Sequence, residues 1–139
     1  MRILLDTTAL VKRYALEPGR GRVFTLSEAA SELCVAAHCK IEVLSALRRR
    51  QSEGSLDPVG VERVWLRVQE EFAEMTVVPL AGAVEAHAVA ALLNTPLRGC
   101  VALHIGSAQA ASVDLFVTAD PRQAEAATRC GLATELIES

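Results

Sequence analysis

The residues of this chain with the clearest chemical potential are acids that follow apolar, strand-like runs. The apolar run at residues 3–5 ends in Asp6, and two hydroxyl residues, Thr7 and Thr8, come next. Continuous apolar residues are typical of a strand that is covered on both faces. In an open α/β sheet, ligands bind outside the carboxyl ends of the strands, so this position favours a chemical role for Asp6. The alternative is that Asp6 only caps the following helix or forms a turn.

The same pattern returns near the end of the chain, where an apolar run is followed by Thr118 and then Asp120. Parallel strands can present Asp6 and Asp120 at one edge of a sheet. A third acid, Glu42, lies between apolar residues near the start of a predicted helix. It either faces solvent, as the helical period allows, or is held inward for a purpose.

Carboxylates that cluster in a cleft raise one another's pKa, so such a cluster is normally kept ionised by a hard cation. Mg²⁺ or Mn²⁺ is the expected ion, and it would position a water nucleophile and neutralise charge on a phosphodiester. A zinc site is not expected. The three histidines His38, His87 and His104 lack Cys or His partners at ligand spacing, and the pair His38 and Glu42 is a weak signal.

Length and composition indicate one globular domain over residues 1–139, with a core of aliphatic side chains. The chain is 51% hydrophobic but only 4% aromatic, and its net charge is −3. We find no secretory signal and no stretch long enough to span a membrane, so we expect a cytoplasmic protein. The cysteines are interpreted as reduced core thiols; they are Cys34, Cys39, Cys100 and Cys130.

Strand-like and helix-like segments alternate along the chain, which predicts parallel βαβ units and a three-layer α/β/α sandwich. Its central, mainly parallel sheet would have four to five strands. The predicted strands are residues 1–5, 33–37, 76–79, 114–118 and 132–137. The predicted helices are residues 8–16, 20–30, 38–53, 58–73, 84–93, 100–111 and 121–129.

Four blocks of this sequence together resemble the PIN-domain family, in particular toxins of the VapC type. The blocks are residues 4–14, 41–49, 102–105 and 116–120, and they cover essentially the whole chain in the family's order. The resemblance implies a PIN-like fold, a metal-dependent endoribonuclease acting on RNA, a VapB-type antitoxin as partner and often a homodimer or toxin–antitoxin hetero-oligomer. It assigns Asp6, Glu42 and Asp120 to the first, second and fourth acids of the family's metal site.

One acid of the family pattern is absent from this chain. The family has an Asp directly before Ala-Leu-His, where this sequence has Val101. The loss removes a charge and a potential metal ligand, which puts catalysis in doubt while leaving the fold untouched. Thr7 and Thr118 are expected to orient Asp6 and Asp120, or else simply to satisfy the strand ends. His104 is interpreted as a satisfied buried histidine.

The leading interpretation is a Mg²⁺-dependent endoribonuclease, weakened by Val101. The alternative is a catalytically degenerate PIN-fold module that still binds antitoxin or RNA. A phosphatase of the haloacid-dehalogenase type is disfavoured, because it needs a second Asp where Thr8 lies. The scarcity of charge between Gly99 and Val113 predicts apolar surface for a partner to cover.

Overall fold

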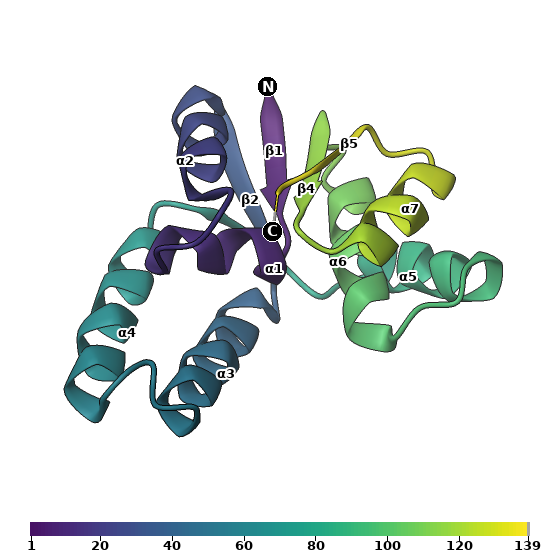
Figure 1. The fold of residues 1–139 in the computed structure, drawn as a ribbon. Coiled ribbons are helices and arrows are strands. Elements are labelled where there is room, and N and C mark those ends of the chain that lie inside the picture. The colour runs from purple at the N-terminus through teal and green to yellow at the C-terminus, as the bar shows by residue number, and fades with distance from the viewer. Residues whose placement is uncertain (139) are drawn as a thin grey trace.

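A five-stranded parallel sheet forms the middle layer of the structure, a computed structural model that describes residues 1–138 (Figure 1). The strand order is β3-β2-β1-β4-β5, which places β1 at the centre, and each neighbouring pair is parallel. The predicted sandwich with a mainly parallel sheet is therefore confirmed. The strands are β1 (Arg2–Leu5), β2 (Glu32–Ala36), β3 (Thr76–Val78), β4 (Leu115–Thr118) and β5 (Thr134–Leu136).

Helices cover both faces of this sheet (Figure 1). The earlier helices, drawn in purple to teal, lie on one side: α1 (Thr7–Leu10), α2 (Arg20–Ala29), α3 (Cys39–Ser52) and α4 (Pro58–Phe72). The later helices lie on the other side: α5 (Gly82–Asn94), α6 (Gly99–Ala110) and α7 (Pro121–Arg129). None of the helices in residues 1–138 is long and apolar enough to cross a membrane.

The central position of β1, with both faces covered, explains why residues 3–5 are continuously apolar. Ile3 and Leu5 pack into a core shared with the earlier helices, whereas Leu4 packs into a second core with Phe116 and the later helices. All three β1 side chains are at most 1% exposed. Burial on both faces leaves residues 3–5 no position at which a polar side chain could reach water, which explains why this part of the strand is apolar.

The first helix differs from its prediction as one helix over residues 8–16. The α-helical turn α1 stops at Leu10 and continues as a 3₁₀ turn, η1 (Val11–Tyr14). The buried ammonium of Lys12 donates to the Pro18 carbonyl at 2.9 Å and to Glu17 at 3.3 Å. These bonds link η1 to the Glu17-Pro18-Gly19 segment. The tighter 3₁₀ turn thus gives the buried Lys12 ammonium its hydrogen-bond acceptors.

The uncharged stretch from Gly99 to Val113 serves the core of this chain, in contrast to the expectation that it would expose apolar surface. In α6 the buried residues include Ala102, Ile105 and Ala108. A Cβ on Gly106 would lie 2.7 Å from the Val84 carbonyl oxygen, so α5 and α6 approach as closely as glycine permits. Most exposed large apolar residues of this half of the molecule lie instead before or on α5, at Val77, Leu80, Val89, Leu92 and Leu93, and one more, Leu136, lies on β5.

All four cysteines are free thiols. Cys34 and Cys39 are buried, as interpreted from the sequence, and Cys130 is partly buried. Cys100 is exposed at the start of α6, so the interpretation as a core thiol is wrong for this residue.

Candidate functional site

Asp6 lies at the carboxyl end of β1 and is completely buried. One carboxylate oxygen, Oδ1, accepts hydrogen bonds from the Thr8 hydroxyl at 2.7 Å and from the Ala9 backbone N–H at 2.9 Å. The other oxygen accepts from the Thr118 hydroxyl on β4. Asp6 therefore does cap α1, and its carboxylate also links β1 to β4.

Burial raises the pKa of Asp6 above its ordinary value. The nearby His104 and the three hydrogen bonds act in the opposite direction, because they stabilise the ionised form. A positive charge placed beside Asp6 would favour the carboxylate further, which is the electrostatic condition expected at a cation site.

Glu42 occupies the first turn of α3 and points toward the end of the sheet, not into open solvent. Its Oε1 accepts from the Thr7 hydroxyl at 2.7 Å and lies 2.6 Å from Nε2 of His104. Nε2 of His38 is 3.4 Å away. Partial burial acts to raise the pKa of Glu42, but the bonds from His104 and Thr7 hold that pKa below its ordinary value.

Asp120 follows β4 and is the N-cap of α7, where its side chain accepts from the Arg122 N–H at 2.9 Å. Its own backbone N–H donates to the Thr118 hydroxyl at 3.1 Å, and that hydroxyl donates to Asp6. Asp120 is partly exposed. A single hydroxyl thus connects the backbone of one predicted site acid to the carboxylate of another.

The two threonines expected to support the acids are both engaged, but with different partners. Thr7 donates to Glu42 of α3, whereas its predicted partner was Asp6. Thr118 donates to the Asp6 carboxylate and only accepts from the Asp120 backbone. Thr8, which follows Asp6 by two positions and whose hydroxyl can bond that carboxylate, does donate to Asp6. The sheet register decides these partners, because it sets which strand end faces which helix.

A cavity of about 270 Å³ opens beside these residues. Val101 of α6 lines it together with Glu42, so the position that lacks the expected acid does face the same space as an acid that is present. The exposed Arg49 of α3 and the buried Gln123 of α7 also line this cavity. The lining residues are Thr7, Thr8, Val11, Glu42, Ser45, Ala46, Arg49, Val101, His104 and Gln123.

Two histidines converge on Glu42, and sequence reasoning gave neither of them a place in the site. His38 precedes α3 and His104 projects from α6; their ring centroids are 4.2 Å apart. His104 is 2% exposed, as predicted, but its Nδ1 has no hydrogen-bond partner within residues 1–138. It is therefore not the fully satisfied histidine that was expected. The spacing of four between His38 and Glu42 was the available signal, since it puts them one helical turn apart.

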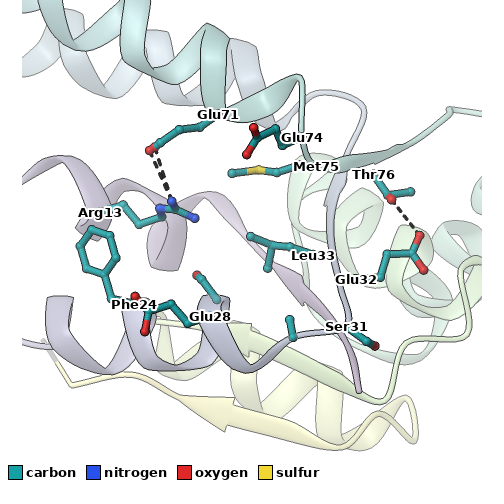
Figure 2. A pocket seen from close by; sticks show the side chains of 12 residues that line it. Arg13, Phe24, Glu28, Ser31, Glu32, Leu33, Glu71, Glu74, Met75 and Thr76 are labelled. Carbon is teal, nitrogen blue, oxygen red and sulfur yellow. Dashed lines mark hydrogen bonds and ion pairs between the residues drawn. The ribbon is translucent and has the colours of Figure 1, made fainter.

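A second cavity, of about 450 Å³, lies at the opposite end of the strands (Figure 2). It is bordered by Glu32 at the start of β2 and by residues of α2 and α4. Figure 2 shows Arg13 reaching across this space to Glu71, with Phe24 beside it. None of the predicted site acids lines this cavity, so its geometry gives it no part in their chemistry.

Comparisons with known proteins identify the family and similar folds. The family model of the PIN domain matches residues 3–128. No curated protein sequence matches the chain. Among solved structures, DNA-bound VapBC from Salmonella typhimurium superposes with a TM-score of 0.71 at 16% identity, covering 97% of this chain and 97% of that chain.

Two further structures give similar agreement. FitAcB from Neisseria gonorrhoeae has a TM-score of 0.70 at 14% identity, with 95% of each chain covered. VapC20 from Mycobacterium tuberculosis, described as a toxin that cleaves the sarcin-ricin loop, has a TM-score of 0.67 at 13% identity, covering 89% of this chain and 94% of that chain. At such identities the likeness shows the fold alone.

Proposed function

This chain belongs to the PIN-domain family, and we propose that it is a divalent-metal-dependent endoribonuclease of the VapC toxin type. The observation that carries the proposal is the cavity at the carboxyl ends of the strands, which Glu42 and Val101 line together and which Thr7 and Thr8, the residues after buried Asp6, also line. The solved neighbours include a toxin–antitoxin complex from Klebsiella pneumoniae and DNA-bound VapBC and FitAB, which supports a protein of this class; a cytoplasmic location is part of the proposal.

Asp6, Glu42 and Asp120 are the proposed catalytic residues and the proposed ligands of a Mg²⁺ or Mn²⁺ ion. Such an ion would supply Lewis-acid stabilisation of the phosphodiester and an activated water. The residues fit a hard cation only in part. Their carboxylates are suitable oxygens, but both oxygens of Asp6 already accept protein hydrogen bonds and Val101 offers no ligand atom. We therefore expect weak Mg²⁺ binding and slow cleavage.

Arg49 is the proposed contact for the RNA phosphate. It lines the cavity and is exposed, and within residues 1–138 it makes no ion pair, whereas its neighbour Arg50 pairs with Glu17 at 3.0 Å. A guanidinium can bind a phosphate through two parallel hydrogen bonds. Among the other residues of the cavity wall, Gln123 can hydrogen-bond ribose or base edges, and the Thr7 and Thr8 hydroxyls, which already donate to Glu42 and Asp6, can accept from them.

Cleavage of a mixed RNA pool with added Mg²⁺ or Mn²⁺ tests the proposal. We expect slow, EDTA-sensitive cleavage that Glu42→Gln abolishes. Glu53→Gln, an exposed acid at the other end of the same helix, is the matched control and should cleave normally. Cleavage that survives Glu42→Gln would reject the site assignment.

The missing ligand at Val101 specifically favours a second candidate, a degenerate PIN-fold module that binds RNA or antitoxin without cleaving. RNA binding with no cleavage under any metal, lost on Arg49→Gln but kept in Arg48→Gln, would decide for this alternative. A VapB-type antitoxin is the proposed protein partner in both cases, and an antitoxin-like reading frame directly upstream is its first test.

A further inference from the structure

Three potential metal ligands, two of them histidines, lie together, although the sequence predicted no metal site with histidine ligands. One ligand atom each from His38, Glu42 and His104 lies within 4.8 Å of the other two. The residues come from the N-cap of α3, the first turn of α3 and the middle of α6. Two separate helices thus bring two imidazoles and one carboxylate to a common point.

We propose that His38, Glu42 and His104 form a site for a divalent transition-metal ion of the Zn²⁺ type, Zn²⁺ or Co²⁺, in preference to Mg²⁺. Two imidazoles and one carboxylate are the protein ligands of many catalytic zinc sites, which keep a further position open for water. Mg²⁺ prefers oxygen ligands, so nitrogen ligands select against it. The site shares Glu42 with the proposed nuclease centre but does not require that RNA is cleaved.

His104 is held in the position that a ligand needs. Its ring is 2% exposed, and Nε2 is directed at Glu42, 2.6 Å away. In the metal-free protein Nε2 must carry the proton that it shares with the carboxylate. Binding of a metal at Nε2 moves that proton to Nδ1, which is buried and has no acceptor within the described residues, so a water would have to accept from Nδ1 in the metal-bound form. The shift frees the Nε2 lone pair for a metal.

His38 is the ligand of this site whose side chain can reorient. Its Nε2 donates to the Cys100 backbone carbonyl at 2.9 Å and lies 3.4 Å from Glu42. The ring is tilted by 44° against that of His104. This side chain is 23% exposed, compared with 2% for His104, so it has room to turn from the carbonyl to a bound ion.

Glu42 is already supported as a ligand. The Thr7 hydroxyl donates to Oε1 at 2.7 Å, a bond that comes from α1 and that a metal on the histidine side need not replace. Hydrogen bonds of this kind orient metal ligands and raise affinity. The carboxylate also supplies negative charge, which compensates for the cost of placing a divalent ion in a half-buried site.

Isothermal titration of the whole protein with ZnCl₂, CoCl₂ and MgCl₂ tests the inference. We expect one site for Zn²⁺ and for Co²⁺, and at least ~10-fold weaker binding of Mg²⁺. His38→Gln and Glu42→Gln should each weaken Zn²⁺ at least ~10-fold, since even loss of a residue that only supports a ligand costs that much. His38 is partly exposed, so its variant should fold, as a melting curve will verify.

His87→Gln is the matched control, because His87 is exposed on α5 and outside the cluster. It should bind Zn²⁺ as the wild type does. Cys100→Ser controls for the exposed thiol near His38. Unchanged Zn²⁺ affinity in His38→Gln, affinity lost in Cys100→Ser, or a sulfur-to-cobalt charge-transfer band in the Co²⁺ spectrum would each overturn the inference.

The nuclease proposal and the metal-site proposal can be rejected separately. Zn²⁺ binding that depends on His38, without cleavage under any metal, would reject the nuclease and leave the metal site standing. Mg²⁺-dependent cleavage that His38→Gln leaves unchanged, together with no Zn²⁺ binding, would reject the metal site and keep the nuclease.

Discussion

At the scale of single residues, Val101 offers the most direct test of the candidate site. Val101→Asp places a carboxylate in the cavity that Glu42 lines. It adds a hard oxygen ligand, so we expect RNA cleavage with Mg²⁺ to rise at least ~10-fold. Without metal the added charge lies in the same cavity as the Glu42 carboxylate, so the melting temperature should fall and should recover with Mg²⁺. Val101→Asn adds the shape without the charge and is the control; equal rates in all three proteins would place Val101 outside the reaction.

Asp6 gives a pH dependence whose sign follows from its raised pKa. The folded protein holds this proton more tightly than the unfolded chain, so the free energy of unfolding falls as pH rises from the ordinary pKa of aspartate through the raised value. Asp6→Asn removes this titration. In EDTA, the melting temperature of the wild type should therefore drop relative to Asp6→Asn over that interval. Parallel curves for the two proteins would contradict the raised pKa.

At the scale of elements, the close approach of α5 and α6 sets the position of Val101 and His104. Gly106→Ala would bring a methyl group 2.7 Å from the Val84 carbonyl oxygen and 2.9 Å from the Ala88 nitrogen. Both neighbours are backbone atoms, so the helices must separate, at a cost of about 1–3 kcal/mol. Urea denaturation should show this loss, and Zn²⁺ binding should weaken because His104 moves with α6.

Gly99→Ala is the matched control for this substitution, because it lies in the same helix with nothing within 4 Å of the added methyl. Alanine is the better helix former, so Gly99→Ala should be neutral or stabilising by up to ~1 kcal/mol. A Gly106→Ala protein as stable as the wild type would show that the helix contact is looser than its geometry indicates.

At the scale of the whole molecule, the exposed apolar residues of α5 predict association. Val89, Leu92 and Leu93 are spaced by three and four positions, so they share one helix face, and they are 48%, 42% and 80% exposed. Light scattering of the purified chain should show a homodimer or a co-purifying partner. The double variant Leu92→Glu, Leu93→Glu should shift it toward monomer without lowering its melting temperature.

Leu16→Glu is the control for this prediction. Leu16 is 92% exposed but does not belong to α5, since it lies between η1 and α2. It should leave the assembly unchanged. A well-behaved wild-type monomer at high concentration, with no partner, would contradict the prediction.

The sequence by itself determined the order and type of the elements, because local signals specify them. Asp57-Pro58 marks a helix start, and Asp57 does cap α4 through the Gly60 N–H at 2.6 Å. The apolar run at residues 3–5 specifies a strand buried on both faces, and Asp6 ends it. These features depend on neighbours along the chain, so they can be predicted before the tertiary structure is known.

Only the tertiary structure decided which side chains meet. His104 is 62 residues from Glu42, and nothing in the local sequence of α6 indicates that its imidazole lies against α3. The threonine partners depend likewise on the alignment of β1 with β4, in which Leu5 lies beside Val117. Contacts between distant segments arise from sheet register and helix packing, and those are properties of the whole chain rather than of any one stretch of it.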